Sequence, residues 1–103
     1  MRYEVIVAPE AARAYRSMPA SRRAEVRDAL DRHLRYEPTR VSKSRIKRLR
    51  GVSRPQYRLR IGEVRVFYDV TDEAVEILAI VTKAEAARWL AEHGTPDPPG
   101  GTG

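Results

Sequence analysis

The stretch that most constrains the fold is residues 57–70, which read YRLRIGEVRVFYDV. Two alternating runs flank Gly62-Glu63, a Gly-X pair suited to a two-residue type II′ hairpin turn. Side chains in a strand alternate between two faces, so this turn fixes which residues share a side of the ribbon. The predicted register pairs Ile61 with Val64, Leu59 with Val66 and Tyr57 with Tyr68, all on one side.

The opposite side of the predicted hairpin carries arginines. Arg58 lies across from Phe67, and Arg60 lies directly across from Arg65. Like charges opposite each other destabilise a sheet, by a few tenths to about 1 kcal/mol. Three guanidinium groups gathered on one face therefore indicate a site for a polyanion, with phosphate as the natural ligand. A merely solvated polar face is the alternative.

Positive charge is concentrated around this hairpin. The chain has a net charge of +6, and ten of its 20 Lys and Arg residues lie between Arg40 and Arg65 with a single acid, Glu63. A localised basic stripe is typical of nucleic-acid binding or of an acidic protein partner. Residues 39–55 show no clean periodicity; either they form a charged linker or, as we favour, an ordered loop that extends the positive surface. The predicted nucleic-acid-binding residues of this segment and its continuation are Lys43, Arg45, Lys47, Arg48, Arg50 and Arg54.

The composition limits the classes of site that the chain can build. The 103 residues suit one domain, and the absence of cysteine excludes disulfides and thiolate metal sites. Two histidines, His33 and His93, are too few for a metal cluster, so we expect no metal and no cofactor. No apolar run approaches the roughly 20 residues of a membrane span, and no signal-peptide pattern is present, so we expect a cytoplasmic protein without a membrane partner.

The N-terminal third predicts a strand and a helical hairpin. Residues 2–8 alternate as a strand, Pro9 begins a helix that Pro19 ends, and Ser21 caps a second helix to about Tyr36. His33 falls within the apolar stripe of the second helix, and we interpret it as a packed side chain rather than a catalytic one. The stripe consists of Val26, Ala29, Leu30, His33 and Leu34, with outer ion pairs Asp28–Arg32 and Asp31–Arg35.

The C-terminal third predicts one buried strand and one helix. Residues 75–81 are apolar on both faces beyond Glu76, which suits a central strand. Thr82 and Glu85 form a capping box that opens a helix ended by Gly94, and residues 94–103 are predicted to be a disordered tail. The predicted fold is α+β: an N-terminal strand and helical hairpin packed on a small antiparallel sheet of about four strands, with a short C-terminal helix, all in residues 1–93.

The order of these elements and three motifs carry a resemblance to a known family. The motifs are Leu49-Arg50-Gly51, then Tyr57-Arg58-Leu59-Arg60, then Arg65-Val66-x-Tyr68. With this spacing the chain resembles the RelE/ParE toxin superfamily of type II toxin–antitoxin systems over about Tyr3 to Leu90. The hairpin resembles the RelE branch most.

The resemblance implies a function and a set of partners. RelE-like toxins are ribosome-dependent endonucleases that cut mRNA without a metal and are neutralised by an acidic antitoxin. By position, Arg58, Arg60 and Arg65 fall where the family carries basic residues that hold phosphate oxygens and transition-state charge. The resemblance thus implies a translation-inhibiting mRNA endoribonuclease with ribosome, mRNA and antitoxin as partners.

The sequence departs from the family pattern at the proton-transfer positions. Arginine is a poor general base because its pKa is above about 12, and the family's C-terminal arginine and tyrosine are replaced by Lys83-Ala84 and by Leu90. Lys83 is the predicted base, and Asp69 is either a base or an ion-pair partner. Trp89 is predicted to pack on the sheet, with base stacking as the alternative.

Two other functions stay open: a ParE-like toxin that inhibits DNA gyrase without cleavage, and a degenerate toxin that acts only with its antitoxin.

Overall fold

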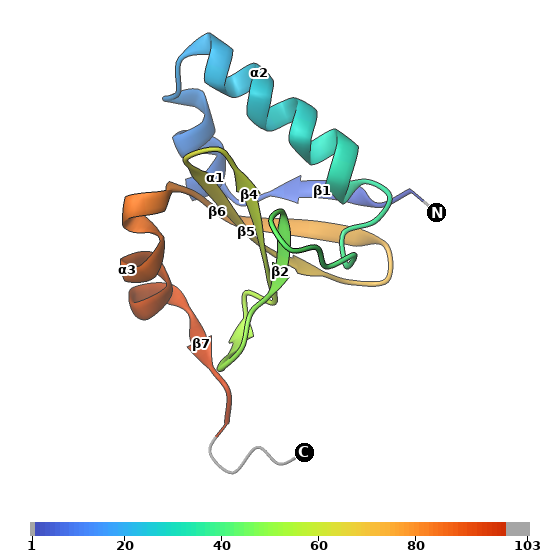
Figure 1. Ribbon diagram of the computed structural model, residues 1–103, viewed down its shortest axis with the longest axis vertical. Helices are drawn as coiled ribbons and strands as arrows, with labels where there is room; N and C mark the ends of the chain where they lie inside the picture. The colour runs from blue at the N-terminus through green and yellow to red at the C-terminus, as the bar shows by residue number, and fades with distance from the viewer. Residues whose placement is uncertain (1, 99–103) are drawn as a thin grey trace.

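A five-stranded mixed sheet organises the computed structural model, which describes residues 2–98. The strand order is β1-β6-β5-β4-β2, in which only β1 and β6 are parallel (Figure 1). The α+β class is confirmed, but the sheet has one strand more than the four expected and is mixed rather than antiparallel, because β1 runs parallel to β6. Its strands are β1 (Glu4–Val7), β2 (Ile46–Arg48), β4 (Tyr57–Ile61), β5 (Val64–Val70) and β6 (Ala74–Thr82).

The β4–β5 hairpin has the predicted register. Ile61 pairs with Val64, and Arg60 pairs with Arg65. Gly62 has φ +56°, whereas no residue other than glycine has a positive φ among those described, so Glu63 keeps a negative one. A positive φ at the first turn position alone is the pattern of a type II′ turn. The type II′ turn predicted at Gly62-Glu63 is therefore confirmed.

Two helices cover one face of the sheet (Figure 1). They are α1 (Pro9–Arg16) and α2 (Ala20–Ala29), and α2 continues into a π-helical turn, η1 (Leu30–Leu34). Ser21 is not the cap of α2: Pro19 occupies that position, so the helix begins directly after the proline and Ser21 lies in its first turn. The two predicted ion pairs form, with Arg32–Asp28 at 3.0 Å and Arg35–Asp31 at 2.7 Å.

The core lies between these helices and the apolar face of the hairpin. The fully buried side chains of the cluster include Leu59, Val66 and Tyr68 from the hairpin and Val26 and Leu34 from the helices. These are the faces that the alternation in the strands and the helical spacing predicted, except that His33 of the predicted stripe is half-buried and lines a polar pocket instead. Tyr68 also stacks on Tyr57 with ring centroids 5.4 Å apart.

The third helix, α3 (Lys83–His93), lies on the opposite side of the sheet (Figure 1). The predicted capping box is present, because Thr82 Oγ1 accepts from the Glu85 backbone N–H while the Glu85 carboxylate accepts from that of Thr82. The ring of Trp89 stacks on Phe67 at 5.1 Å, with the planes 8° apart. Helix α3 therefore covers the Phe67 side chain on the arginine-bearing face.

The basic segment before the hairpin is ordered. It forms β2, the edge strand beside β4, and β3 (Val52–Arg54), which pairs with β7 (Thr95–Pro96) in a separate two-stranded sheet. Strand β7 lies within the segment predicted as a disordered tail, and residues 99–103 of that tail are outside the described residues. Of the part of the chain that the structure describes, no helix has the length and apolarity to cross a membrane.

Candidate functional site

The three predicted arginines share one face of the β4–β5 hairpin. Arg60 and Arg65 are directly paired across the strands, and Arg58 is paired with Phe67 on the same face. The pKa of Arg58 is lowered, first by partial burial and then by the positive charges of Arg65 and Arg60. The side chains are therefore close enough to repel one another, and together they form what we call the arginine face.

Arg65 lies deeper than the sequence indicated. Only 6% of its surface is exposed, whereas Arg60 is exposed and Arg58 is half-buried. Its Nη1 atom donates to the carbonyl oxygens of Gly62 at 2.7 Å and Val64 at 3.0 Å. These bonds tie the guanidinium to the hairpin turn, so Arg65 shapes the turn and places a positive charge beneath the surface.

No carboxylate of residues 2–98 neutralises the arginine face. Among residues 2–98, none of the ion pairs involves Arg58, Arg60 or Arg65. In addition, the buried Nε atom of Arg58 has no hydrogen-bond partner. A buried donor without an acceptor costs about 1–3 kcal/mol, more when it is charged, and an anionic ligand oxygen removes that cost. The arginine face thus carries positive charge that the described chain does not neutralise.

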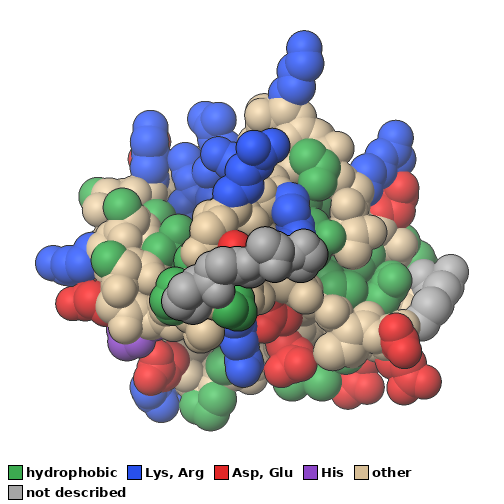
Figure 2. Space-filling view, turned by 90° about the horizontal axis from the view of Figure 1, so that it is seen from below, with side chains coloured by type: hydrophobic (Ala, Val, Ile, Leu, Met, Phe, Trp, Pro, Cys, Tyr) green, Lys and Arg blue, Asp and Glu red, His purple; other side chains and the backbone are tan. Residues whose placement is uncertain are grey.

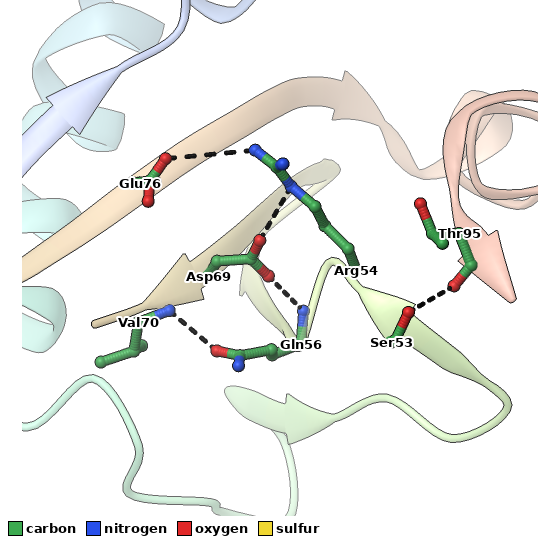
Figure 3. A network of polar contacts seen from close by, with 7 residues as sticks. All are labelled: Ser53, Arg54, Gln56, Asp69, Val70, Glu76 and Thr95. Atoms are coloured by element: carbon green, nitrogen blue, oxygen red, sulfur yellow. Dashed lines mark hydrogen bonds and ion pairs between the residues drawn. The ribbon is translucent and has the colours of Figure 1, made fainter. Parts of the chain in front are cut away.

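Asp69 is occupied by structural contacts (Figure 3). One carboxylate oxygen accepts from the Gln56 backbone N–H at 2.8 Å, and the other pairs with Arg54 Nε at 3.0 Å. Burial raises the pKa of Asp69, while these two contacts and Arg48 oppose the rise and Glu76 adds to it. Of its two predicted roles, the ion-pair partner is the one that the geometry supports. The network holds the start of β4 against β5, where the Gln56 side chain also accepts from the Val70 N–H at 2.8 Å.

The basic residues outside the hairpin are distributed over several surfaces. Lys47 pairs with Arg58 in the sheet and so adjoins the arginine face, which sequence alternation in the short strand β2 did not reveal. Arg48 lies over the Tyr57 ring instead, 5.2 Å from its centroid, and Arg54 is held by Asp69 and by Glu76 at 4.0 Å. Lys43, Arg45 and Arg50 are exposed. Figure 2 shows Lys and Arg side chains crowded along one side of the molecule and most Asp and Glu side chains along the other.

Lys83 lies next to the hairpin turn. Its backbone N–H donates to the Glu63 carbonyl oxygen at 2.7 Å, and its side chain is exposed in the first turn of α3. Helix α3 thus begins beside the turn that closes the arginine face, and the role of Lys83 as a base stays a prediction. Further along α3, Trp89 is flanked by Phe67 and by His93, whose ring centroid is 5.3 Å away. Packing on the sheet, the favoured interpretation for Trp89, is confirmed.

Comparisons with solved structures identify the family. No protein-family model matches the chain, and a search of curated proteins found no match. The archaeal RelE–RelB complex from Pyrococcus horikoshii OT3 matches with a TM-score of 0.60 and 30% identity, over 81% of this chain and 97% of that one. The chain belongs to the RelE-like toxin superfamily. It therefore has the toxin fold of toxin–antitoxin systems.

A second toxin–antitoxin complex supports this RelE-like assignment, and a third structure supports the fold. The toxin–antitoxin complex RelBE2 from Mycobacterium tuberculosis matches with a TM-score of 0.60 and 27% identity, over 80% of this chain and 99% of that one. The YoeB dimer from Staphylococcus aureus matches with a TM-score of 0.58 over 77% of this chain and 94% of that one. Its identity of 20% supports the fold alone. The predicted RelE-like superfamily is thus confirmed.

Proposed function

We propose that this RelE-like protein is the toxin of a type II toxin–antitoxin system and cleaves mRNA on the ribosome in the cytoplasm, without a metal. The observation that carries the proposal is the arginine face, where Arg58 and Arg60 present guanidinium groups that no carboxylate of the described chain neutralises. A guanidinium group offers planar, paired donors that match two phosphate oxygens. An RNA backbone is the polyanion that both this chemistry and the family favour.

The proposed reaction is an internal phosphoryl transfer. The 2′-oxygen of a nucleotide loses its proton and attacks the adjacent phosphorus, and the bond from phosphorus to the 5′-oxygen breaks as that oxygen gains a proton. Negative charge builds on the non-bridging oxygens in the transition state. Arg58 and Arg60 bind these oxygens directly, while the buried Arg65 stabilises the charge from below and holds the turn in place.

Lys83 is the proposed proton acceptor. Of the four catalytic candidates, the three arginines stay protonated, because the pKa of a guanidinium is above about 12. Lys83 begins α3 next to the turn, and its amine is proposed to take the proton from the 2′-hydroxyl. Asp69 is not proposed in this role, since both of its oxygens have partners.

The remaining basic residues are proposed to hold the ribosome and the message. Lys47 extends the arginine face across β2, and the exposed side chains of Lys43, Arg45 and Arg50 continue the positive surface before the hairpin. Arg48 and Arg54 also belong to this surface, although each has intramolecular contacts. Binding through such groups weakens as salt rises because phosphate contacts release counterions.

We further propose that an acidic antitoxin docks on the opposite side of the molecule. A groove of about 370 Å³ runs between β1 and the two N-terminal helices, with an apolar floor that includes Val5, Tyr15 and Leu30. Arg16, Arg27 and Arg35 stand around it together with one acid, Asp31, which pairs with Arg35 at 2.7 Å. Next to it, Ile6 and Val7 of the edge strand β1 are 45% and 39% exposed. Apolar anchors ringed by positive charge suit an amphipathic acidic segment.

The test is translation of a defined mRNA in vitro with primer extension of the product. We expect new 5′ ends within codons that occupy the ribosomal A site, and a loss of cleavage of about 100-fold in Arg60→Gln or Arg58→Gln, as for removal of a transition-state donor. Arg13→Gln is the matched control, because it removes one exposed charge from α1 on the other side of the sheet. Equal cleavage by Arg60→Gln, Arg58→Gln and the wild type would contradict the site assignment.

One observation favours a second candidate, a toxin that binds and does not cut. Every side chain of the arginine face is a guanidinium, which cannot accept a proton, and Arg65 is bound to turn carbonyls. In that case translation stops with no new 5′ ends, or DNA supercoiling by gyrase is inhibited in a parallel assay. Either result, with translation-linked cleavage absent, would replace the nuclease proposal.

A further inference from the structure

A second cluster of positive groups lines a pocket away from the hairpin, where η1 ends and the chain approaches β2. Its volume is about 230 Å³, and its polar lining comes from Arg32, His33, Glu37, Arg40, Ser42 and Arg45. Three guanidinium groups and one imidazole thus surround a cavity that has a single carboxylate in its wall. Such an excess of cationic donors is suited to an anion.

The donors of this pocket differ in how far they are already engaged. Arg32 pairs with Asp28 at 3.0 Å, and Arg40 pairs with Glu37 at 2.9 Å. Arg45 has no ion pair within residues 2–98. The Ser42 hydroxyl oxygen accepts from the backbone N–H groups of Arg45 at 3.0 Å and Ile46 at 3.2 Å. Its own hydrogen is left to donate outward, so Ser42 and Arg45 are the open donors.

His33 enters this pocket from the π-helical turn η1. Such turns are rare and occur often at functional sites, because the extra residue changes the direction of the side chains. Burial lowers the pKa of His33, and the charges of Arg45 and Arg32 lower it further, while Asp28 opposes them. A neutral imidazole has one N–H to donate. The electrostatic potential around the His33 ring is positive because Arg45 and Arg32 lie near it.

The pocket is connected to the arginine face through Arg45. The same residue lines a neighbouring hollow of about 300 Å³ together with Ser44, Arg60 and Gly62. The Arg60 backbone N–H also donates to the Arg45 carbonyl oxygen at 2.9 Å, which fixes the two residues side by side. Positive groups therefore continue from the hairpin to the pocket along one edge of the sheet.

We propose that this pocket is a phosphate-binding site, in which the Arg45 guanidinium, the Ser42 hydroxyl and the His33 ring hold one phosphate group. Binding there needs no cleavage and so goes beyond the proposed reaction. The phosphate can come from an RNA strand that also crosses the arginine face, or from free inorganic phosphate. The RNA source rests on the proposed function, whereas the binding of phosphate as such does not.

Histidine resonances followed by NMR in the full chain test the phosphate site directly. Inorganic phosphate, added at low ionic strength, is expected to shift the His33 ring signals saturably and to raise the pKa of His33, because an anion offsets Arg32 and Arg45. Asp28, Glu37 and Arg40 are the other charged groups around the ring, and their contributions are the same in both states. His93, at the far end of α3, is the internal control and is expected to stay unchanged.

Two variants make the test specific. Arg45→Gln is expected to weaken phosphate binding by at least about tenfold, the effect of losing a charged hydrogen bond, while Arg13→Gln binds as the wild type does. Parallel, unsaturated shifts of His33 and His93 would overturn the proposal, and so would equal affinities of Arg45→Gln and the wild type. Circular dichroism of each variant verifies that the fold is intact.

A short single-stranded RNA then distinguishes the two sources of phosphate. It is added to the wild-type protein in the absence of ribosomes, because the proposed cleavage takes place on the ribosome. If RNA shifts His33 and inorganic phosphate competes with it, the pocket binds the nucleic acid backbone. If phosphate shifts His33 and RNA does not, the RNA source is overturned and free phosphate is the ligand. Phosphate binding that persists in a protein without nuclease activity would separate this site from the proposed reaction.

Discussion

The two faces of the β4–β5 hairpin are built from alternate residues of the same strands and have opposite properties. On the helix-covered face, Leu59, Val66 and Tyr68 are fully buried. On the other face, Arg60 and Arg65 lie directly opposite each other. The first arrangement lowers the free energy of the folded state, and the second raises it. Because alternate side chains point to opposite faces, a short hairpin can use one face for the core and leave the other face available for a ligand.

Contacts with the rest of the molecule offset the repulsion among the three arginines of the arginine face. Helix α3 covers its Phe67 end through the Trp89 stack, and the turn carbonyls of Gly62 and Val64 accept from Arg65. Arg58 and Arg60, by contrast, have no carboxylate partners in the described chain. The contrast predicts that substitutions on the two faces will have opposite effects on stability, and Leu59→Ala and Arg60→Gln measure this directly.

The largest effect is expected for Leu59→Ala on the helix-covered face. Leu59 is fully buried, so its truncation leaves a cavity and lowers the free energy of unfolding by about 2–5 kcal/mol. Urea denaturation measures the loss. A cost below about 1 kcal/mol, the range of surface substitutions, would show that this face does not carry the core.

Tyr68→Phe is expected to have an intermediate effect. The Tyr68 hydroxyl donates to the buried Pro38 carbonyl oxygen at 2.7 Å, and burial raises the pKa of Tyr68 far above its usual value. The variant keeps the ring stack on Tyr57 but leaves an acceptor unpaired, which costs about 1–3 kcal/mol. Thermal unfolding compared with Tyr57→Phe, which deletes a hydroxyl without removing the Pro38 bond, isolates the contribution of the hydrogen bond.

Arg60→Gln is expected to stabilise the fold by a few tenths to about 1 kcal/mol, because it removes a like-charge pair with Arg65. Denaturation at low salt measures the gain, and added salt is expected to reduce it by screening the pair in the wild type. Arg13→Gln, on α1, serves as the control for loss of one positive charge. A loss of stability in Arg60→Gln beyond that of the control would mean that the arginine face contributes to folding.

The smallest effect concerns pH. The pKa of His33 in the folded protein is below the ordinary 6.5, so protons bind the unfolded chain more readily at this residue. The contribution of His33 to stability is complete when the pH is above its ordinary pKa. That contribution decreases as the pH falls from the ordinary pKa toward the lower pKa of the folded state. His33→Gln is expected to flatten the stability profile below about pH 7. Denaturation in buffers free of phosphate tests this, and an unchanged slope would contradict it.

Much of the fold follows from local sequence patterns. Alternation around Gly62-Glu63 predicted the register of the hairpin, and Thr82 with Glu85 predicted the start of α3. These features depend on residues close in sequence, whose spacing sets the geometry. Strands β2, β3 and β7 were missed, because three-residue and two-residue strands are too short to show a period and form only where a partner strand is present.

The sequence by itself determined that three arginines share a face, since strand alternation and a two-residue turn leave no other register. Only the tertiary structure decided that Arg65 is buried and bound to turn carbonyls, that Asp69 is engaged by Gln56 and Arg54, and that Arg45 joins His33 in a pocket. The physical reason is that burial, pairing and cavities arise from segments distant along the chain. Local spacing contains no information about how those segments pack.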